Sequence, residues 1–434
     1  MEPLPEIFRT VTAFVPSPSN GWLPLPRKPM LQPEHRLSRP DSPPFILRAL
    51  SFILQKWAAP VSALLISLPA QRAMADASPA GLSAGKEGGL LLNGKPWRGL
   101  GVNYYDAFAR LLGDGKAGDV EAGFRVLADA KIPFVRFSAC GYWPADWSLY
   151  RTDREEYFRR LDTVVRCAEK NGIGVIPSLF WHQPTVSDLV AEPLQEWGNP
   201  ASKTIAFMRA YTQETVTRLR GSKAVWAWEF GNEFNLPADL PNAAEHRAPV
   251  VPALGTAAAR SERDDLRHDD IRTALTEFSK EVRRHDPHRL ILSGNAFPRV
   301  SAWHQMHDRT WGRDSEAQRL EMLDSDNPPL ISTLTGRLYS ASDFEFLPAA
   351  AAEAKRAGTP LFIGEFGVPG VSTEESRRQF RSQLEALEQN RVPLAALWVF
   401  DFKGQDADWN VTPANARAEQ LRLVSETNFR WQAE

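Results

Sequence analysis

Short apolar runs alternate with amphipathic stretches along this chain from about Gly88 to its end. Eight of these runs have the length and the dense apolar composition of strands that are buried on both faces. They span residues 98–103, 134–138, 174–180, 225–230, 290–293, 330–333, 361–364 and 395–400. The stretches with helical periodicity span residues 120–130, 154–171, 202–220, 265–285, 315–323, 344–357, 374–389 and 414–427. The pattern therefore predicts eight strands, each followed by a helix.

Eight successive strand–helix units predict the α/β class and, within it, a (β/α)8 TIM barrel. They occupy about 340 residues, which is within the usual size range of that fold. A doubly wound open sheet is the alternative, but no glycine-rich phosphate-binding loop follows the first strand. Upstream of that strand, Asn93-Gly94 stands between apolar residues and predicts a β-hairpin. We therefore assign residues 86–434 to one barrel domain.

Residues 1–85 lack this alternation and form a separate extension in our interpretation. The first 44 residues contain 11 of the 34 prolines, which is typical of disorder or of a gene model whose true start is Met30 or later. An apolar segment follows, and Ala73-Met-Ala75 has the small-x-small pattern of a cleavage site. We interpret residues 45–75 as a candidate signal peptide and expect a secreted or periplasmic protein. The alternative is an apolar or membrane-associating linker, since Pro60 interrupts the segment.

Composition narrows the class of partner. The chain is 43% hydrophobic and 24% charged, as soluble globular proteins are. Its formal net charge of −2 offers no electrostatic attraction to nucleic acid or to an anionic membrane. The apolar segment near residue 60 is shorter than the ~20 residues that a membrane span needs. We expect a monomer that does not bind nucleic acid and does not span a membrane.

The only two cysteines, Cys140 and Cys167, do not suggest a disulfide framework. Cys140 follows the second predicted strand, and Cys167 lies deep in the helix after it. A helix of that length is roughly 20 Å long at ~1.5 Å per residue, which separates the two thiols too far for a bond. We predict that both are free and assign a role to neither.

Two of the predicted strands end in the same way, with a glycine and then a glutamate. Glu233 closes the stretch Trp228-Glu-Phe-Gly-Asn-Glu at the fourth strand, and Glu365 closes the seventh in Gly364-Glu-Phe-Gly. Active sites of (β/α)8 barrels lie at the carboxyl ends of the strands, so both side chains project into the same mouth. A pair of carboxyl groups is what glycoside hydrolysis requires. The alternative is that each glutamate only caps its strand through salt bridges.

These two motifs resemble the acid/base and nucleophile motifs of glycoside hydrolase family 5, the cellulase and β-mannanase family of retaining (β/α)8 glycosidases. The resemblance covers roughly residues 88–430. It implies that Glu233 is the general acid/base and Glu365 the nucleophile of a double displacement, with the carboxyls ~5 Å apart. It implies hydrolysis of a β-glucan or a β-mannan without a cofactor or a metal. The phenylalanine at 234 departs from the family, which usually has proline there.

The resemblance also assigns supporting residues. It implies that Asn232 contacts the sugar 2-hydroxyl and that Arg136, at the end of the second strand, steadies the nucleophile. A guanidinium beside Glu365 would keep that carboxylate ionised. The remaining matches are His182 after the third strand, Tyr339 as a donor to the nucleophile, Trp398 as the floor of the sugar site, and Asn103 and Tyr104 as cleft residues after the first strand. The family often has His-x-Tyr where this chain has Arg337-Leu-Tyr339.

Tryptophans fall in predicted loops beyond the strand ends, where flat rings suit the apolar faces of sugars. They are Trp143, Trp147, Trp181, Trp303, Trp311 and Trp409. Individually each is explained as well by loop packing; together they suggest a carbohydrate cleft. The long segment 236–260 follows the fourth strand and is placed to form a wall of that cleft.

Two rival functions remain open at this point. A metal-dependent barrel enzyme is one, because His285 and His288, or His304 and His307, have spacings seen in ligand pairs. Neither pair stands at a predicted strand end with a third ligand nearby. A non-catalytic carbohydrate-binding barrel is the other, and it would keep the aromatic residues while losing one glutamate. Both glutamates are present, so we predict an O-glycosyl hydrolase.

Overall fold

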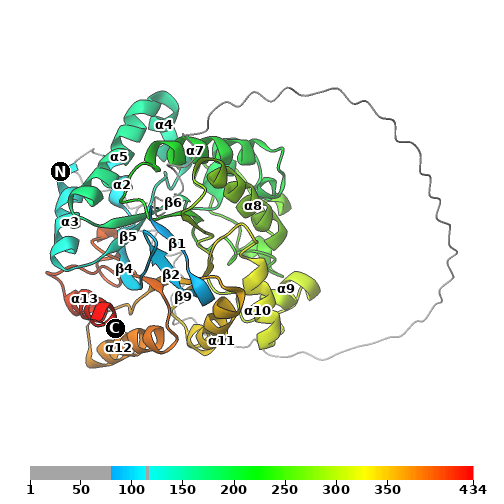
Figure 1. Ribbon diagram of the computed structural model, residues 1–434. Helices are drawn as coiled ribbons and strands as arrows, with labels where there is room; N and C mark the ends of the chain where they lie inside the picture. Colours follow the sequence, from blue (N-terminus) through cyan, green and yellow to red (C-terminus); the bar gives the residue numbers. More distant parts are fainter. Residues whose placement is uncertain (1–79, 114–116, 371, 434) are drawn as a thin grey trace, which may run out of the picture. The chain divides into compact units, whose positions relative to one another are not determined.

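The computed structural model describes residues 80–113, 117–370 and 372–433, and Figure 1 shows helices surrounding a central set of strands. Eight parallel strands lie in the sheet order β8-β7-β6-β5-β4-β11-β10-β9. The (β/α)8 barrel prediction is thereby confirmed. The predictions about the N-terminal extension and the candidate signal peptide at 45–75 lie outside the described residues.

The barrel strands are β4 (Gly99–Asn103), β5 (Phe134–Ser138), β6 (Gly174–Phe180), β7 (Ala227–Gly231), β8 (Leu290–Leu292), β9 (Leu334–Leu338), β10 (Leu361–Phe366) and β11 (Leu394–Leu397). β8 and β9 are the two ends of the sheet. They are bridged where Ser332 N donates to Ile291 O at 2.8 Å and Ile291 N donates to Ser332 Oγ at 3.2 Å. The barrel is therefore nearly closed.

The described helices are α2 (Ala107–Gly113), α3 (Ala117–Asp129), α4 (Ser148–Thr152), α5 (Arg154–Lys170), α6 (Pro184–Leu189), α7 (Lys203–Leu219), α8 (His268–His285), α9 (Ala302–Asp308), α10 (Glu316–Ser325), α11 (Ala341–Ala357), α12 (Glu374–Gln389) and α13 (Ala418–Ala433). Side-chain caps begin several of them, because the first N–H groups of a helix need acceptors. Asp153 caps α5 and Ser202 caps α7. Gly358, with φ of 67°, ends α11 in the left-handed conformation that glycine adopts at low cost.

One predicted strand is wrong. The sixth strand, expected at residues 330–333, is β9 at Leu334–Leu338, so it begins after the predicted segment ends. Leu330 is instead 40% exposed in the preceding turn. The apolar residues at 330–333 led to the prediction. The strand itself contains a glycine and a buried arginine, Arg337. A charged side chain inside the barrel masks the apolar pattern on which strand prediction depends.

The barrel has an apolar floor at the amino ends of its strands. Side chains from several strands pack there with a three-stranded sheet of β1 (Leu82–Ala84), β2 (Leu90–Leu92) and β3 (Lys95–Pro96). β2 and β3 are antiparallel, and Asn93 and Gly94 between them have φ of 52° and 78°, so the predicted hairpin is confirmed. Leu82, Leu90 and Trp226 belong to this floor cluster. The opposite, carboxyl end of the barrel is left to polar side chains.

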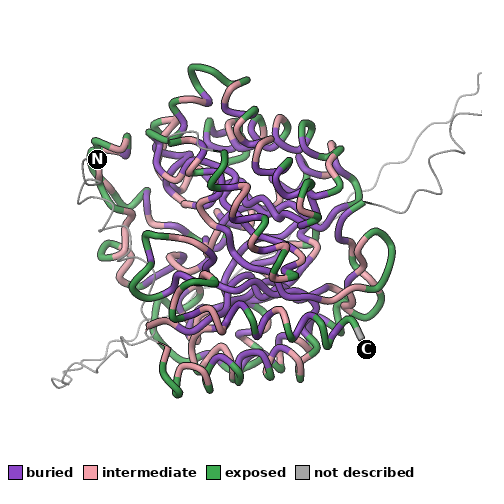
Figure 2. The backbone as a smooth tube through the Cα atoms, turned by 90° about the vertical axis from the view of Figure 1, so that its left-hand side faces the viewer, coloured by how far each residue is buried: buried purple, intermediate pink, exposed green. Residues whose placement is uncertain are grey.

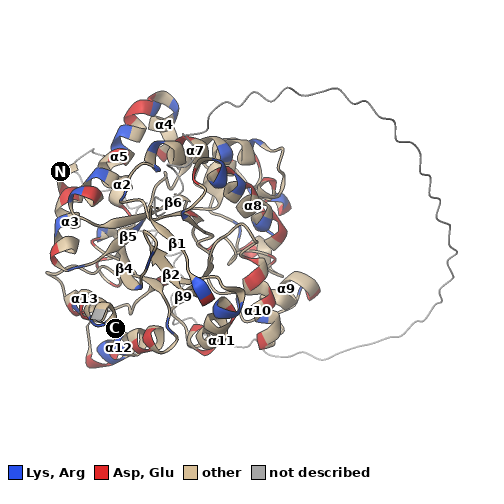
Figure 3. Cartoon of the chain, viewed as in Figure 1, with Lys and Arg blue, Asp and Glu red and all other residues tan. Residues whose placement is uncertain are grey.

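A second apolar layer lies between the outer faces of the strands and the helices. It includes Phe124 of α3, Tyr211 of α7 and Phe278 of α8, all fully buried. Figure 2 shows the strands buried and the exposed positions concentrated on the surrounding helices. Figure 3 shows both signs of charge interspersed on those helices. Among the described residues, no helix combines the length and the apolar composition that crossing a membrane requires.

Both cysteines are free, as predicted, and both are buried. Burial raises the pKa of the Cys140 thiol to about 11, although Ser138 and the N–H of Trp181 partly oppose that rise. Burial also raises the pKa of Cys167. Both thiols therefore stay protonated and unreactive at neutral pH.

Candidate active site

Arg136 on β5 is the centre of a buried polar network at the carboxyl end of the barrel. Its Nε donates to both oxygens of Glu229 on β7, at 2.7 and 3.0 Å. Its Nη1 donates to Asn103 Oδ1 and to Glu365 Oε1, each at 3.0 Å. Its Nη2 donates to Asn232 Oδ1 at 2.8 Å. One fully buried guanidinium on β5 thus joins Asn103 of β4, Glu365 of β10, Glu229 of β7 and Asn232 just after β7.

Strand geometry brings these side chains together. Successive residues of a strand point to opposite faces, so every second residue of a barrel strand points inward. On β5, Val135 and Phe137 pack outward against helices while Arg136 points inward. On β7, Trp228 and Phe230 likewise pack outward, which leaves Glu229 inside.

A β-bulge positions Glu365. Along β10, Ile363 pairs with Gly336 and Glu365 pairs with Arg337, so Gly364 is an extra residue relative to β9. Bulges re-aim side chains and are frequent beside functional sites. The two oxygens of Glu365 have separate partners. Oε1 accepts from Arg136 and lies 3.3 Å from Arg337 Nε, and Oε2 accepts from the Tyr339 hydroxyl at 3.0 Å.

Glu233 lies two residues beyond β7 and is less enclosed. Its N–H donates to Gly294 O at 2.9 Å, which ties it to the loop after β8. Its side chain keeps 21% of its accessible surface, and its Oε1 is 3.7 Å from Arg337 Nε. Its φ of 52° is uncommon for a residue with a side chain and marks local backbone strain.

The phenylalanine after Glu233 has a structural consequence. A proline restricts the preceding residue to negative φ and extended conformations. Phe234 imposes no such restriction, so it is compatible with the positive φ of Glu233. Its ring is fully buried and contacts Phe230 at a centroid distance of 4.8 Å and Trp197 at 5.8 Å. An apolar anchor therefore holds the backbone at the position where the family usually has proline.

The two glutamates have different electrostatic environments. Burial raises the pKa of Glu233 to about 7, and the negative charge of Glu365 adds to the rise. Arg337 and Arg136 act in the opposite direction, and Asp343 contributes a smaller rise. Glu365, by contrast, is in ion pairs with Arg136 and Arg337. One carboxyl is thus suited to carry a proton near neutral pH, while its neighbour faces two guanidinium groups.

The facing oxygens of the two carboxyls are close together. Each lies near the same nitrogen, Arg337 Nε, at 3.3 Å for Glu365 and 3.7 Å for Glu233. They are therefore separated by no more than about 7 Å, whatever the angle at the nitrogen. Retaining glycosidases hold their carboxyls ~5–5.5 Å apart, which this limit accommodates.

Sequence reasoning did not recognise the role of Arg337. In the sequence it is only the residue that departs from the family's His-x-Tyr pattern, yet its side chain is 3% exposed and lies near both glutamates. Its Nη2 also donates to Asn232 Oδ1 at 2.8 Å, opposite the bond from Arg136. The two arginines occupy the amide oxygen of Asn232, so its NH2 group remains the part available to a ligand.

Two further charged residues were also missed. Glu229 was treated as part of an apolar strand, although its position two residues before Gly231 gives it the inward phase of β7. Arg299, in the loop after β8, has Nη1 buried without a hydrogen-bond partner among the described residues. Burial lowers the pKa of Arg299 to about 10, and the nearby charge of Glu233 opposes that fall. No local sequence pattern marks Arg299 as a neighbour of the acid/base candidate.

Of the two residues predicted to line the cleft after the first strand, β4, only Asn103 lies at the site. Asn103 is fully buried beneath it and donates from Nδ2 to Gly364 O at 3.0 Å, so it supports Arg136 and β10. Tyr104 has the opposite phase and packs outward against Phe124 and Phe400, which corrects the expectation that it lines the cleft. Tyr105, the next residue, instead lies 4.9 Å from the ring of Trp181.

His182 lies at the edge of the site as a neutral imidazole. Burial lowers its pKa to about 4, despite the hydrogen bond to the Tyr142 carbonyl. The ring stacks on Tyr142 at a centroid distance of 4.2 Å, and Nδ1 is 3.3 Å from both Tyr142 O and Thr185 Oγ1. A neutral ring here provides shape and one hydrogen-bonding nitrogen, with no charge.

The tryptophans differ in where they lie. Trp181 stacks near Trp398 at 6.1 Å and its ring lies 4.3 Å from the Arg136 guanidinium, while Trp409 lies 5.2 Å from Tyr339. Trp181 and Trp409 thus lie beside Arg136 and Tyr339, the hydrogen-bond partners of Glu365. Trp147 is different: it is fully buried among tyrosines of α4, α5 and α7 and belongs to the core. Trp303 stacks on His307, and Trp311 is 50% exposed.

The segment 236–260 is fastened to neighbouring loops. Arg260 forms a bidentate ion pair with Asp188 of α6, at 2.6 and 2.7 Å, in which both side chains are nearly inaccessible. Gly255, at φ of 85°, approaches Pro144 so closely that a Cβ there would be 3.0 Å from the proline Cβ. The segment is thus held against the loop after β5.

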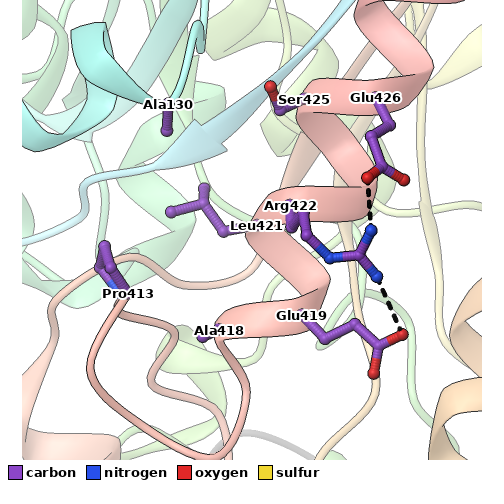
Figure 4. A pocket seen from close by; sticks show the side chains of 8 residues that line it. All are labelled: Ala130, Pro413, Ala418, Glu419, Leu421, Arg422, Ser425 and Glu426. Atoms are coloured by element: carbon purple, nitrogen blue, oxygen red, sulfur yellow. Dashed lines mark hydrogen bonds and ion pairs between the residues drawn. The ribbon is translucent and has the colours of Figure 1, made fainter.

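A hollow of about 670 Å³ lies away from these residues, on the outer face of α13 (Figure 4). It is lined by Ala130, Pro413, Ala418, Glu419, Leu421, Arg422, Ser425 and Glu426. Along α13, Arg422 pairs with Glu419 and Glu426 (Figure 4). None of the candidate site residues lines it, so it has no part in the site at the barrel mouth.

The histidines that suggested a metal site have other partners. His304 Nδ1 is 2.7 Å from Asp314 Oδ1, and His285 Nε2 is 3.0 Å from Glu281 Oε1. Within the described part of the chain, no three histidine, cysteine or acidic side chains gather closely enough to hold a metal ion.

Breaking the buried pair of Arg136 and Glu229 should destabilise the fold. Arg136→Met leaves Glu229 buried without its cation, and we expect a loss of about 3–5 kcal/mol in the free energy of unfolding. Adding Glu229→Met should recover part of this loss because the unpaired carboxylate is removed. Denaturant unfolding measures both. Arg218→Met at the 30% exposed pair with Asp162 is the control, with an expected loss below about 1 kcal/mol. Equal losses in the two single variants would contradict the prediction.

Comparison with solved structures finds the same fold. The endo-1,4-β-mannanase of Rhizomucor miehei is similar at 16% identity and a TM-score of 0.59, over 82% of this chain and 100% of that one. The endo-β-1,4-mannanase of Thermotoga petrophila gives 14% and 0.53, over 77% and 78%. The β-mannanase of the blue mussel Mytilus edulis gives 15% and 0.53, over 80% and 96%. No curated protein sequence matches the chain.

The comparison with protein families is decisive because it covers all eight barrel strands. The model of the cellulase family, glycosyl hydrolase family 5, matches residues 97–404, well over half of the chain. The matched region begins just before β4, ends after β11, and contains both strand-end glutamates. The chain belongs to glycosyl hydrolase family 5.

Proposed function

We propose that this protein is a retaining β-glycosidase in which Glu365 is the nucleophile and Glu233 the general acid/base. The observation that carries the proposal is the unequal environment of two adjacent carboxyls at the barrel mouth. Burial raises the pKa of Glu233 to about 7, whereas Glu365 is held by two guanidinium groups and a phenol. One group therefore supplies a proton while the other supplies a charged oxygen.

The chemistry proceeds in two balanced displacements. A Glu365 oxygen bonds to the anomeric carbon as the glycosidic C–O bond breaks, and Glu233 gives its proton to the departing oxygen. A water then gives a proton to Glu233 as its oxygen bonds to the anomeric carbon and the Glu365–carbon bond breaks. Two inversions at one carbon give net retention. Asn232 is fixed with its NH2 group free, which suits it to donate to a hydroxyl beside the anomeric carbon.

We propose β-mannan as the substrate ahead of β-glucan. The structural neighbours described above are mannanases, and they share the architecture of the barrel. The rings of Trp181, Trp398 and Trp409 at the site provide the flat apolar surfaces that pyranose rings stack on. A panel of β-mannan, cellulose and mixed β-glucan, assayed by release of reducing ends, tests the order of preference.

Substitution of each glutamate should give a distinct defect. Glu365→Ala should abolish hydrolysis of every substrate, because no other group attacks the anomeric carbon. Glu233→Ala should reduce turnover of polysaccharide by roughly 10²–10⁴-fold. It should spare the first step on an aryl glycoside whose leaving group needs no proton, which is measurable as a burst of phenol. The glycosyl-enzyme should then accumulate and be released faster by azide.

Cleavage by the wild type that is lost in variants which still bind distinguishes this enzyme from a non-catalytic carbohydrate-binding barrel. The isosteric variants Glu233→Gln and Glu365→Gln should still bind mannooligosaccharide in calorimetry while failing to cleave it. Cleavage by either variant at the wild-type rate would show that the pair is misassigned.

Activity should fall as pH rises through about 7. The acid form of Glu233 is the one that protonates the leaving oxygen, and with a pKa of about 7 it is the main form only below that pH. We expect kcat/KM on mannooligosaccharides to decline above pH 7, and to decline much less on aryl glycosides with good leaving groups. Initial rates between pH 4 and 10 check this, with unfolding monitored in parallel. Identical profiles for both substrate types would exclude Glu233 as the acid.

We further propose that the protein is exported and acts outside the cytoplasm. The apolar segment at 45–75 and Ala73-Met-Ala75 support this proposal. Expression of the full chain with an epitope at its carboxyl end should yield a product in the periplasm or medium that begins near residue 76. Replacing four leucines and isoleucines at 64–68 with serine should retain the protein in the cytoplasm. Equal export of both forms would overturn the proposal.

A further inference from the structure

Arg337 on β9 is oriented by neutral acceptors on one side. Its Nη2 donates to Asn232 Oδ1 at 2.8 Å and to Gly294 O at 2.7 Å. Its Nη1 donates to Gly336 O at 3.1 Å and to Asn295 O at 3.4 Å. These bonds hold the two terminal nitrogens and leave Nε as the part of the guanidinium that faces the carboxyl pair.

The Nε atom lies between the two glutamates. It is 3.3 Å from Glu365 Oε1 and 3.7 Å from Glu233 Oε1. It is buried and forms a well-directed hydrogen bond with neither, nor with any other described residue. The positive charge is therefore shared between two nearby oxygens instead of being committed to one.

Arg136 does not share its charge in this way. Of the two glutamates it forms an ion pair with Glu365 alone, through Nη1, and its Nε is occupied by Glu229. Burial lowers the pKa of Arg337, but the charges of Glu365, Glu233 and Glu229 outweigh burial and raise it. Arg337 thus stays a cation throughout the working pH range.

The guanidinium of Arg337 fits beside β10 because residue 364 is a glycine. A Cβ at that position would be 2.2 Å from Arg337 Nη1, so any side chain there would displace the guanidinium. The same glycine is the extra residue of the bulge that aims Glu365. One small residue therefore serves both the nucleophile and the cation beside it.

The proposed reaction keeps the charge of the pair constant. Before attack, Glu365 is an anion and Glu233 carries a proton. After attack, Glu365 is a neutral ester and Glu233, having given its proton away, is the anion. One negative charge is present in both states, and it moves from one side of Arg337 Nε to the other.

We propose that Arg337 is a positioning residue that compensates this single charge in both halves of the cycle, first on Glu365 and then on Glu233. The inference rests on the proposed retaining function. It assigns to Arg337 a role in the second displacement, which requires Glu233 as an ionised base. A cation that served only the nucleophile would have no such role.

Other charged or titratable groups face Glu233, Glu365 and Arg337, and substitution of Arg337 leaves them unchanged. They come from β5, β7, the loop after β8, the loop after β9 and the start of α11, and they are Arg136, Glu229, Arg299, Tyr339 and Asp343. Because they remain in place, a shift in pH dependence on changing Arg337 reports the loss of its charge.

The test measures the two displacements separately in the full-length protein. The alkaline limb of kcat/KM reports the acid form of Glu233 in the free enzyme. The acid limb of reactivation, after trapping with an activated 2-deoxy-2-fluoro-β-mannoside, reports the ionised form of Glu233 in the glycosyl-enzyme. Removing a cation within ~4 Å raises the pKa of a carboxyl by roughly one unit or more. In Arg337→Met we therefore expect both limbs to move upward by about one pH unit.

Three control variants separate charge from structure. Arg337→Lys keeps the charge and loses the fork to Asn232, so its rates should fall while both limbs stay within a few tenths of a pH unit of the wild type. Asn232→Ala should lower rates without moving either limb. Tyr339→Phe removes a bond from Glu365 Oε2 alone and should leave the reactivation limb in place.

The outcomes are distinct. If a folded Arg337→Met variant shifts neither limb, or shifts that of kcat/KM alone, the shared-charge role is wrong. Should that variant not fold, Arg337→Gln replaces it, and a full-unit shift in the Lys variant would by itself refute a role carried by charge. Failure of the proposed function looks different, because a wild-type protein that neither cleaves β-glycosides nor accumulates the fluoroglycosyl adduct would remove the cycle itself.

Discussion

The ion pair between Arg136 and Glu229, fully enclosed inside the barrel, is the constraint on which the site depends. Charges buried in a protein interior must be compensated nearly one for one, since an unpaired ion there costs several kcal/mol. Glu229 occupies the Nε side of Arg136 in a fixed direction. That leaves the two terminal nitrogens to point at Asn103, Asn232 and Glu365. The permanent pair thus sets the direction in which the reactive groups are held.

A barrel suits this requirement because its interior has two chemically different ends. The floor is filled by apolar side chains and closed by the β1–β3 sheet. Above it, inward positions on β4, β5, β7, β9 and β10 are polar, and their hydrogen bonds run mostly across the barrel between strands that are not adjacent in the sheet. The apolar floor supplies burial free energy, and the upper layer needs only to be internally satisfied. Function is concentrated where the barrel opens to substrate.

Sequence reasoning succeeded where pattern and function agree. Seven of the strands follow from short apolar runs, and the hairpin follows from Asn93-Gly94 between apolar residues. The placement of both glutamates at one end follows from their positions where two of those runs end. It failed at β9, where Gly336 and Arg337 interrupt the apolar pattern, because the site required a cation inside a strand. Tyr104 is next to an inward-pointing residue in the sequence, so its own side chain points outward. Arg299 comes near Glu233 because the loop after β8 folds back toward it. Such contacts depend on three-dimensional closure, which local patterns do not encode.

Two arginines face the carboxyl pair, although one cation would neutralise Glu365, the proposed nucleophile. A single cation fixed beside Glu365 would stabilise the negative charge on Glu365. It would therefore oppose the transfer of that charge to Glu233. A second cation placed between the carboxyls has no such preference, because its distances to the two oxygens differ by little. Arg136 accordingly holds geometry, through Glu229 and Asn103, while Arg337 lies where the charge moves. The strained φ of Glu233 and the bulge at Gly364 are the backbone features that bring both carboxyls to that cation.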